Sequence, residues 1–170
     1  MKDDRLEFQK WHFDYIMEQI KIADIKINFL LVIYTALMGT LNLLLPEMIN
    51  KFSNRPCPYK IAFIAFCLFF LYCFIKFFIY FVKTITPRIN PQEILNDNAY
   101  RSPIFWGDLA EIKLEDFKKI DLENFRQDLD TQILINARIA KRKFEYVKKA
   151  YCILMPTILF FFMLIIFTKF

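Results

Sequence analysis

The stretch IAFIAFCLFFLYCFIKFFIYFV, residues 61–82, decides the fold class of this protein. Its length lies within the roughly 17–25 residues that a helix needs to cross the hydrocarbon core of a bilayer. Its one charged residue, Lys76, stands near the end of the stretch, where a long side chain can extend to the lipid headgroups. The stretch therefore predicts a transmembrane helix.

Two further apolar stretches predict two more transmembrane helices. They read NFLLVIYTALMGTLNLLL at residues 28–45 and AYCILMPTILFFFMLIIFT at residues 150–168, and neither contains an acidic or basic residue. Pro156 interrupts the second of these stretches, and we expect a kink there. Spanning helices tolerate proline because neighbouring groups can satisfy the carbonyl that it leaves free.

The composition excludes an ordinary soluble protein. The chain has 170 residues, of which 56% are hydrophobic and 18% aromatic, and only 2 are glycine. This apolar share is well above that of an average soluble domain, and the length leaves room for one small membrane module. The net charge of +5 does not indicate nucleic-acid binding, because basic residues of a membrane protein anchor it on the cytosolic side.

Basic residues near the three spans predict the orientation. They crowd the segments before the first span, after the second and before the third, namely Lys2, Arg5, Lys10, Lys21, Lys26, Lys83, Arg88, Arg138, Lys141, Arg142, Lys143, Lys148 and Lys149. By the positive-inside rule, residues 1–27 and 83–149 are cytosolic. Residues 46–60 are then an outer loop, and the C-terminus lies outside.

The two cytosolic segments predict amphipathic helices that continue into the membrane. In residues 1–27, apolar side chains recur at steps of three and four, at Phe13, Ile16, Ile20, Ala23 and Ile27. A similar series leads into the third span without Gly or Pro, at Leu122, Leu129, Ile133, Asn136, Ala140, Phe144, Val147 and Tyr151. The fold class is therefore an all-α membrane protein, with about three transmembrane helices and long helices that extend into a cytosolic helical region. Such apolar stripes pack within one chain or against another copy, so we expect a homo-oligomer.

No motif in the sequence indicates an enzyme or a metal site. A glycine-rich phosphate loop, a GxSxG motif and a nucleophile with a local base are all missing from the sequence. The four cysteines form no CxxC pair, and His12 is the single histidine. We therefore expect no catalytic residue, no metal and no nucleic-acid partner.

Two polar features are candidates for function. Asp24 and Lys26 lie just before the first span, where we interpret them as membrane-interface residues that hold the helix at its depth. The second feature is a cluster ahead of the third span, made of Gln132, Asn136, Arg138, Lys141, Arg142 and Lys143, opposite a loop with Arg101, Trp106 and Asp108.

This second cluster has two interpretations that sequence physics leaves open. It can be a solvated basic face drawn to anionic lipid, with about 1 kcal/mol from each basic residue near the surface. It can equally be a pocket for a phosphate-bearing ligand, with Arg or Lys on the anion and Trp against a base.

Three short motifs resemble those of the Pycsar effector transmembrane family. They are ADIKI at residues 23–27 before the first span, FWGDL at 105–109 with Phe117, and DLDTQI at 128–133 with Lys143. The resemblance covers most of the chain. It implies a bacterial antiphage system with abortive infection, in which a pyrimidine nucleotide cyclase is the functional partner and the effector resides in the inner membrane.

The resemblance also implies a ligand, an action and site residues. A cyclic pyrimidine nucleotide, cUMP or cCMP, binds the cytosolic helices and the protein then impairs the membrane. On this hypothesis Lys143 and Arg101 hold the cyclic phosphate, Trp106 stacks on the base and Asp108 orients the turn, with Asn136 also at the site. The alternative is a membrane scaffold or a conflict-system effector that a protein partner gates without any nucleotide.

Overall fold

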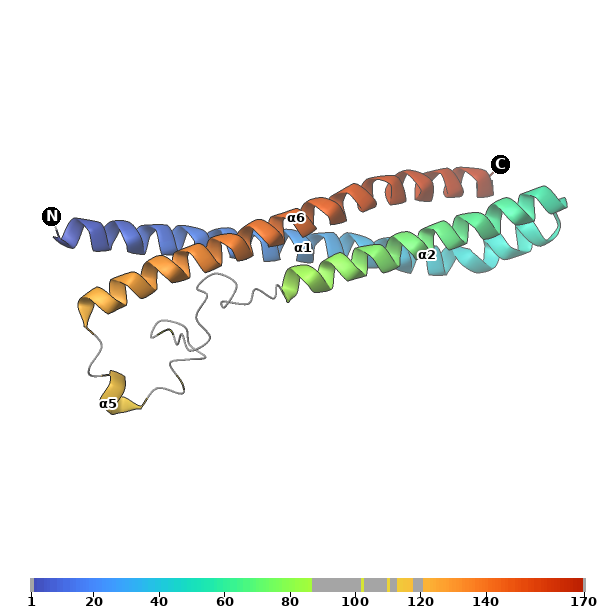
Figure 1. Ribbon diagram of the computed structural model, residues 1–170. Coiled ribbons are helices and arrows are strands. Elements are labelled where there is room, and N and C mark those ends of the chain that lie inside the picture. Colours follow the sequence, from blue (N-terminus) through green and yellow to red (C-terminus); the bar gives the residue numbers. More distant parts are fainter. Residues whose placement is uncertain (1, 87–101, 103–109, 111–112, 118–120, 170) are drawn as a thin grey trace. The chain divides into compact units, whose positions relative to one another are not determined.

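The computed structural model describes residues 2–86, 102, 110, 113–117 and 121–169. These residues form four helices and no strand, namely α1 (Lys2–Ser53), α2 (Cys57–Ile85), α5 (Leu114–Phe117) and α6 (Leu122–Lys169) (Figure 1). In this part of the chain, α1, α2 and α6 are long and apolar enough to cross a membrane. The predicted all-α membrane protein with three spanning helices is thus confirmed.

Helix α1 is a single helix of 52 residues that joins the N-terminal amphipathic segment to the first apolar stretch. At 1.5 Å per residue it is about 78 Å long, well beyond the roughly 30 Å of a hydrocarbon core. The continuous helix expected from the apolar periodicity is therefore present.

The interval 46–60, expected as an outer loop, is mostly helical. Helix α1 continues through Pro46 to Ser53, and α2 begins at Cys57, so only residues 54–56 form the turn. A proline inside a helix removes one backbone donor, and the remaining backbone hydrogen bonds carry the helix onward. Pro56 and Pro58 suit the start of α2, because the first N–H groups of a helix have no partner within it.

Helix α6 runs for 48 residues without a break, as expected from the apolar series that leads into the third span. Pro156 lies inside it. The next residue, Thr157, donates its hydroxyl to the Ile153 carbonyl oxygen at 2.7 Å. Pro156 has no N–H group to donate in this turn of the helix, and the Thr157 hydroxyl supplies an additional donor there, to the Ile153 carbonyl oxygen.

The chain divides into two compact units. Unit 1 comprises Met1–Ala23 and Pro87–Lys143, and unit 2 comprises Asp24–Thr86 and Phe144–Phe170. Both α1 and α6 therefore contribute one segment to each unit. The divisions lie four to six residues from the expected boundaries between cytosol and membrane, which themselves stay predictions.

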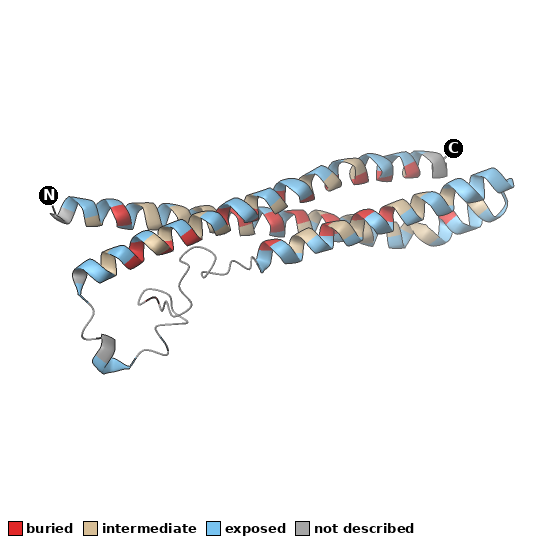
Figure 2. Ribbon diagram, viewed as in Figure 1, coloured by how far each residue is buried: buried red, intermediate tan, exposed pale blue. Residues whose placement is uncertain are grey.

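Unit 2 is a bundle of the apolar parts of α1, α2 and α6. The Tyr34 ring stacks on Phe77 of α2 at 3.9 Å between centroids, and the Tyr34 hydroxyl lies 3.2 Å from Thr157 Oγ1 of α6. Because the Thr157 hydrogen goes to Ile153, Tyr34 is the donor in this bond. Outside this core, large apolar side chains such as Leu43, Leu68 and Phe162 are exposed, as expected for surfaces that face lipid (Figure 2).

Candidate functional site

In unit 1, helix α6 carries a row of polar side chains on one face. Asp128, Gln132 and Asn136 are spaced four residues apart, and Lys143 follows two turns later, so all four share a face. Asp128 is 4% exposed, Gln132 7% and Lys143 5%, while Asn136 is half-buried. We call Asp128, Gln132, Asn136 and Lys143 the polar row.

The other basic residues of the predicted cluster lie elsewhere on α6. Arg138, Lys141 and Arg142 are exposed. A solvated basic face therefore describes these three residues, and it does not describe Lys143. Removing an ammonium group from water is costly unless charged or polar partners surround it. The buried position of Lys143 in unit 1 therefore requires such partners.

Among the described residues of unit 1, two side-chain hydrogen bonds connect α6 to other segments of the unit. Gln9 of α1 donates from Nε2 to Asp130 Oδ1 at 2.7 Å. Ser102 donates from Oγ to Asp128 Oδ2, also at 2.7 Å, and both of these side chains are buried. Hydrogen bonds to an ionised acceptor are among the stronger ones in proteins.

Gln9 is a functional candidate that the sequence analysis missed. A carboxylate only accepts hydrogen bonds, so the contact with Asp130 orients the amide and leaves its Oε1 as an acceptor. This oxygen is buried and has no hydrogen-bond partner among the described residues. One signal was available in the sequence, because Gln9 continues the apolar stripe of Phe13 and Ile16 with a polar residue.

Arg101, Trp106 and Asp108, predicted at the ligand site, lie outside the described residues. The structure thus brings together the part of the predicted site that α6 carries, Asn136 and Lys143. Asp128 and Gln132 lie on the same face of α6, and Gln9 of α1 contacts α6 at Asp130, about 20 Å along the helix from Lys143.

Asp24 and Lys26, predicted at the membrane interface, belong to unit 2. Asp24 is half-buried and Lys26 is exposed. The Lys26 ammonium lies 5.2 Å from the centroid of the Phe144 ring on α6, within the range of a cation–π contact. Their placement at the headgroup level stays a prediction.

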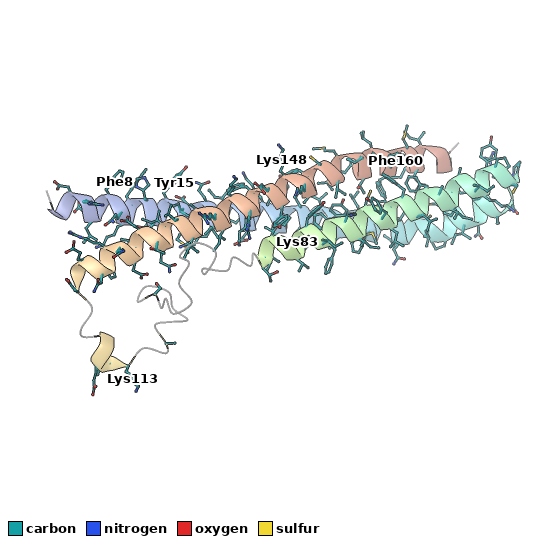
Figure 3. All side chains as sticks on the ribbon, viewed as in Figure 1. Phe8, Tyr15, Lys83, Lys113, Lys148 and Phe160 are labelled. Carbon is teal, nitrogen blue, oxygen red and sulfur yellow. The ribbon has the colours of Figure 1, made fainter. Side chains whose placement is uncertain are left out.

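A second group of lysines and aromatic rings lies between α2 and α6 in unit 2. Tyr80 and Tyr146 stack at 6.3 Å, and the ammonium groups of Lys83 and Lys149 lie 5.9 Å and 5.6 Å from the Tyr146 centroid. Figure 3 labels Lys83 on α2 and Lys148 on α6. An open depression of about 570 Å³ adjoins them, lined by Tyr80, Glu145, Lys148, Lys149, Cys152 and Ile153. Tyrosine and lysine together are typical of helix ends at the bilayer surface.

Within the part of the chain that the structure describes, no three His, Cys, Asp or Glu side chains gather in a way that could hold a metal ion. The polar row is instead suited to binding by hydrogen bonds and charge. Lys143 is a cation, Asp128 an acceptor, and the amides of Gln132 and Asn136 offer both donors and acceptors. Lys143 can bind an anionic group, and Asn136, about 10 Å along the helix from it, can contact another part of the same ligand.

Comparison with known proteins decides the family. The family described as Pycsar effector protein domain matches residues 8–168. The chain belongs to this family. The resemblance found in the three sequence motifs is thus confirmed. No curated protein and no solved structure matches the chain.

Membership establishes the broad role of this Pycsar effector. It acts as an effector in cyclic-nucleotide-signalled antiphage defence and is functionally linked to the cyclase of such a system. Its three apolar helices are those of a membrane protein and are consistent with a location in the cell membrane. The family is a non-catalytic effector domain, and the lack of enzymatic activity in this chain stays a prediction.

Proposed function

We propose that this Pycsar effector binds a cyclic pyrimidine nucleotide, cUMP or cCMP, through the helices of unit 1 and then impairs the membrane through its spanning helices. Family membership supports the signalling role. The observation that carries the location of the ligand site is the polar row, with Asp128, Gln132 and Lys143 buried on one face of α6.

The chemistry of the polar row suits a nucleotide with a cyclic phosphate. A lysine shielded from water binds an anionic phosphate more strongly than a solvated one, because the local dielectric constant is lower. Lys143 is the basic residue of the row. The Asn136 amide, seven residues earlier and thus about 10 Å along the helix from Lys143, offers a donor and an acceptor to the rest of the ligand.

Residues outside the described part complete the proposed site. Arg101 shares the cyclic phosphate with Lys143, Trp106 stacks on the base, and Asp108 orients the turn that carries Trp106. Asn136, half-buried in the row, is a further contact to the ligand.

The proposed effect on the membrane follows from the continuity of two helices. Both α1 and α6 contribute uninterrupted segments to unit 1 and to unit 2. A ligand changes a conformational equilibrium only when it binds one packing better than the other. We infer that the nucleotide favours one packing of unit 1, that the spanning segments repack as a result, and that the loss of membrane integrity leads to abortive infection.

Calorimetric titration of the detergent-purified full chain tests the proposal. We expect binding of cUMP or cCMP and none of cAMP. In Lys143→Gln the affinity should fall at least about tenfold, because a hydrogen bond to a charged group contributes about 1.5–3 kcal/mol. Lys141→Gln, an exposed lysine two residues earlier on the same helix, is the matched control and should bind as the wild type does.

A second variant and a folding check make this test decisive. Arg101→Ala should also weaken binding, and thermal unfolding by circular dichroism shows whether each variant keeps its helices. Equal affinity of the wild type and folded Lys143→Gln would remove the polar row from the site. No binding of either pyrimidine nucleotide in two independent assays would favour gating by a protein partner.

We also infer that the effector is a homo-oligomer. Three aromatic side chains on the part of α1 in unit 1, Phe8, Trp11 and Tyr15, are each at least half exposed. Figure 3 labels Phe8 and Tyr15 on this part of the helix. Phe8 contacts His12 at 4.2 Å, His12 contacts Trp11 at 4.9 Å and Trp11 stacks on Tyr15 at 5.7 Å, so the rings form one patch. An exposed aromatic patch on a segment expected in the cytosol is typical of an association surface.

A further inference from the structure

A cavity of about 380 Å³ lies in unit 2, where the end of α1, the start of α2 and the end of α6 meet. Its walls are almost entirely apolar and are formed by Phe52, Pro58, Tyr59, Ala62, Phe63, Phe66, Phe160, Met163 and Leu164. Figure 3 labels Phe160 on α6. Nothing in the proposed nucleotide site uses these residues.

Stacked rings hold the walls of this cavity in place. Phe52 of α1 stacks on Phe63 of α2 at 4.6 Å, and Phe160 of α6 contacts Phe66 at 6.2 Å and Phe69 at 4.6 Å. Water needs two or more polar partners in such a space, and Tyr59 supplies the one polar side chain of the wall. The natural occupant is therefore apolar.

A positive charge lies beside one wall residue of the cavity. The Arg55 guanidinium is 5.9 Å from the ring centroid of Tyr59, which itself lines the cavity. Lys51 and Lys60 flank this region in the sequence and are exposed. The one acidic neighbour in the last turns of α1, Glu47, pairs with Lys51 at 3.2 Å. Residues 46–60 thus carry three basic residues against one acidic residue, so the charge beside the cavity is net positive and attracts an anion.

We propose that this cavity binds an acyl chain of an anionic phospholipid, with the lipid phosphate against the Arg55 guanidinium. The position along the chain supports a lipid, because the second span is expected to begin at residue 61. Apolar Ala62 and Phe63 lie just inside that boundary, and Arg55 lies just outside it. This order, with the charge outside and the apolar wall inside, matches a phospholipid at the bilayer surface.

Native mass spectrometry of the full chain tests this proposal, with phosphatidylglycerol and phosphatidylcholine of equal chain length as probes. We expect about fivefold more phosphatidylglycerol than phosphatidylcholine to be retained, the factor that one basic residue near an anionic phosphate contributes. Ala62→Trp fills the cavity and should abolish the retention of phosphatidylglycerol. Ala65→Trp, the same change at an exposed alanine on the same helix that does not line the cavity, is the matched control.

A variant that removes the charge of Arg55 distinguishes the contribution of the lipid headgroup from that of the acyl chain. In Arg55→Gln we expect the two lipids to be retained equally, because the cavity still accepts an acyl chain and the phosphate contact is lost. Equal retention of phosphatidylglycerol by Ala62→Trp and Ala65→Trp overturns the proposal. A wild type that retains both lipids equally also overturns the proposal. So does an Ala62→Trp variant that still retains its lipid but changes its oligomeric mass, because that result would mean that a second copy of the chain occupies the cavity.

Discussion

Lys141 and Lys143 are two residues apart on α6 and have opposite surroundings. A helix turns by about 100° per residue, so two residues place the side chains on nearly opposite faces. Lys141 is exposed and Lys143 is 5% exposed. The residue type alone does not show which lysine is buried, because both lysines belong to the same basic run in the sequence. The burial of one of them separates a candidate ligand group from a solvated charge.

Gln9 offers a second test at the residue scale. Gln9→Ala removes the 2.7 Å hydrogen bond to Asp130, and we expect the free energy of unfolding to fall by about 1.5–3 kcal/mol, the usual range for a bond to a charged group. Chemical denaturation in detergent, followed by circular dichroism, measures this change. Gln127→Ala, at an exposed glutamine of α6, should alter stability by less than about 0.5 kcal/mol.

The double variant Gln9→Ala/Asp130→Ala separates the bond from the loss of the side chains. If the bond contributes as expected, the two single effects sum to more than the effect of the double variant. Strict additivity would contradict a stabilising contact between Gln9 and Asp130.

At the scale of the elements, α1 and α6 each combine an amphipathic segment with a spanning segment. Pro46 and Pro156 lie inside these helices and end neither of them. Helix α1 instead ends at Ser53, and a turn of residues 54–56 reverses the chain into α2. The connection between the first two spans is thus short, and the exposed residue Cys57 begins α2 directly after it.

Cys57 allows a direct test of the predicted orientation. Residues 46–60, which include Cys57, are expected outside the cell membrane, so a membrane-impermeant maleimide should label the effector on intact spheroplasts. Cys57→Ser should abolish this labelling. Cys152→Ser should leave it unchanged, because Cys152 lies near the predicted inner end of the third span. Labelling only after permeabilisation would reverse the orientation.

On the scale of the whole molecule, exposed apolar side chains occur in two environments, one expected to face lipid and one expected to face water. In unit 2 they cover the outer faces of three spanning helices, where lipid is the expected neighbour. In unit 1 the exposed patch of Phe8, Trp11 and Tyr15 belongs to a segment expected in the cytosol. Water is a poor neighbour for aromatic rings, so this patch is the better candidate for contact with a second copy.

Removal of the patch should reduce the oligomeric mass. We expect Phe8→Ala/Trp11→Ala to shift the effector toward the monomer in light scattering coupled to size-exclusion chromatography. The reason is that large aromatic side chains contribute much of the binding free energy at protein interfaces. Tyr72→Ala, at an exposed aromatic residue of α2, is the control and should keep the wild-type mass. An unchanged mass in the double variant would exclude the patch as the association surface.

Much of the fold could be predicted from local features of the sequence. Apolar stretches of the right length predicted the three spanning helices, and apolar steps of three and four predicted that α1 and α6 continue beyond the membrane segments. Both features depend on neighbours along the chain. The family motifs are local as well, and the match over residues 8–168 confirms what they indicated.

The candidate site depends on contacts that no local pattern contains. Gln9 meets Asp130 across 121 positions of sequence, and Tyr34 meets Thr157 across 123. How far a helix is rotated about its axis depends on such distant contacts, and this rotation buries Lys143 while Lys141 stays exposed. The linear sequence alone therefore determines the three spans, the long helices and the family. The burial of the polar row and the aromatic cavity depend on packing between helices, because only packing brings residues distant in sequence onto a common surface.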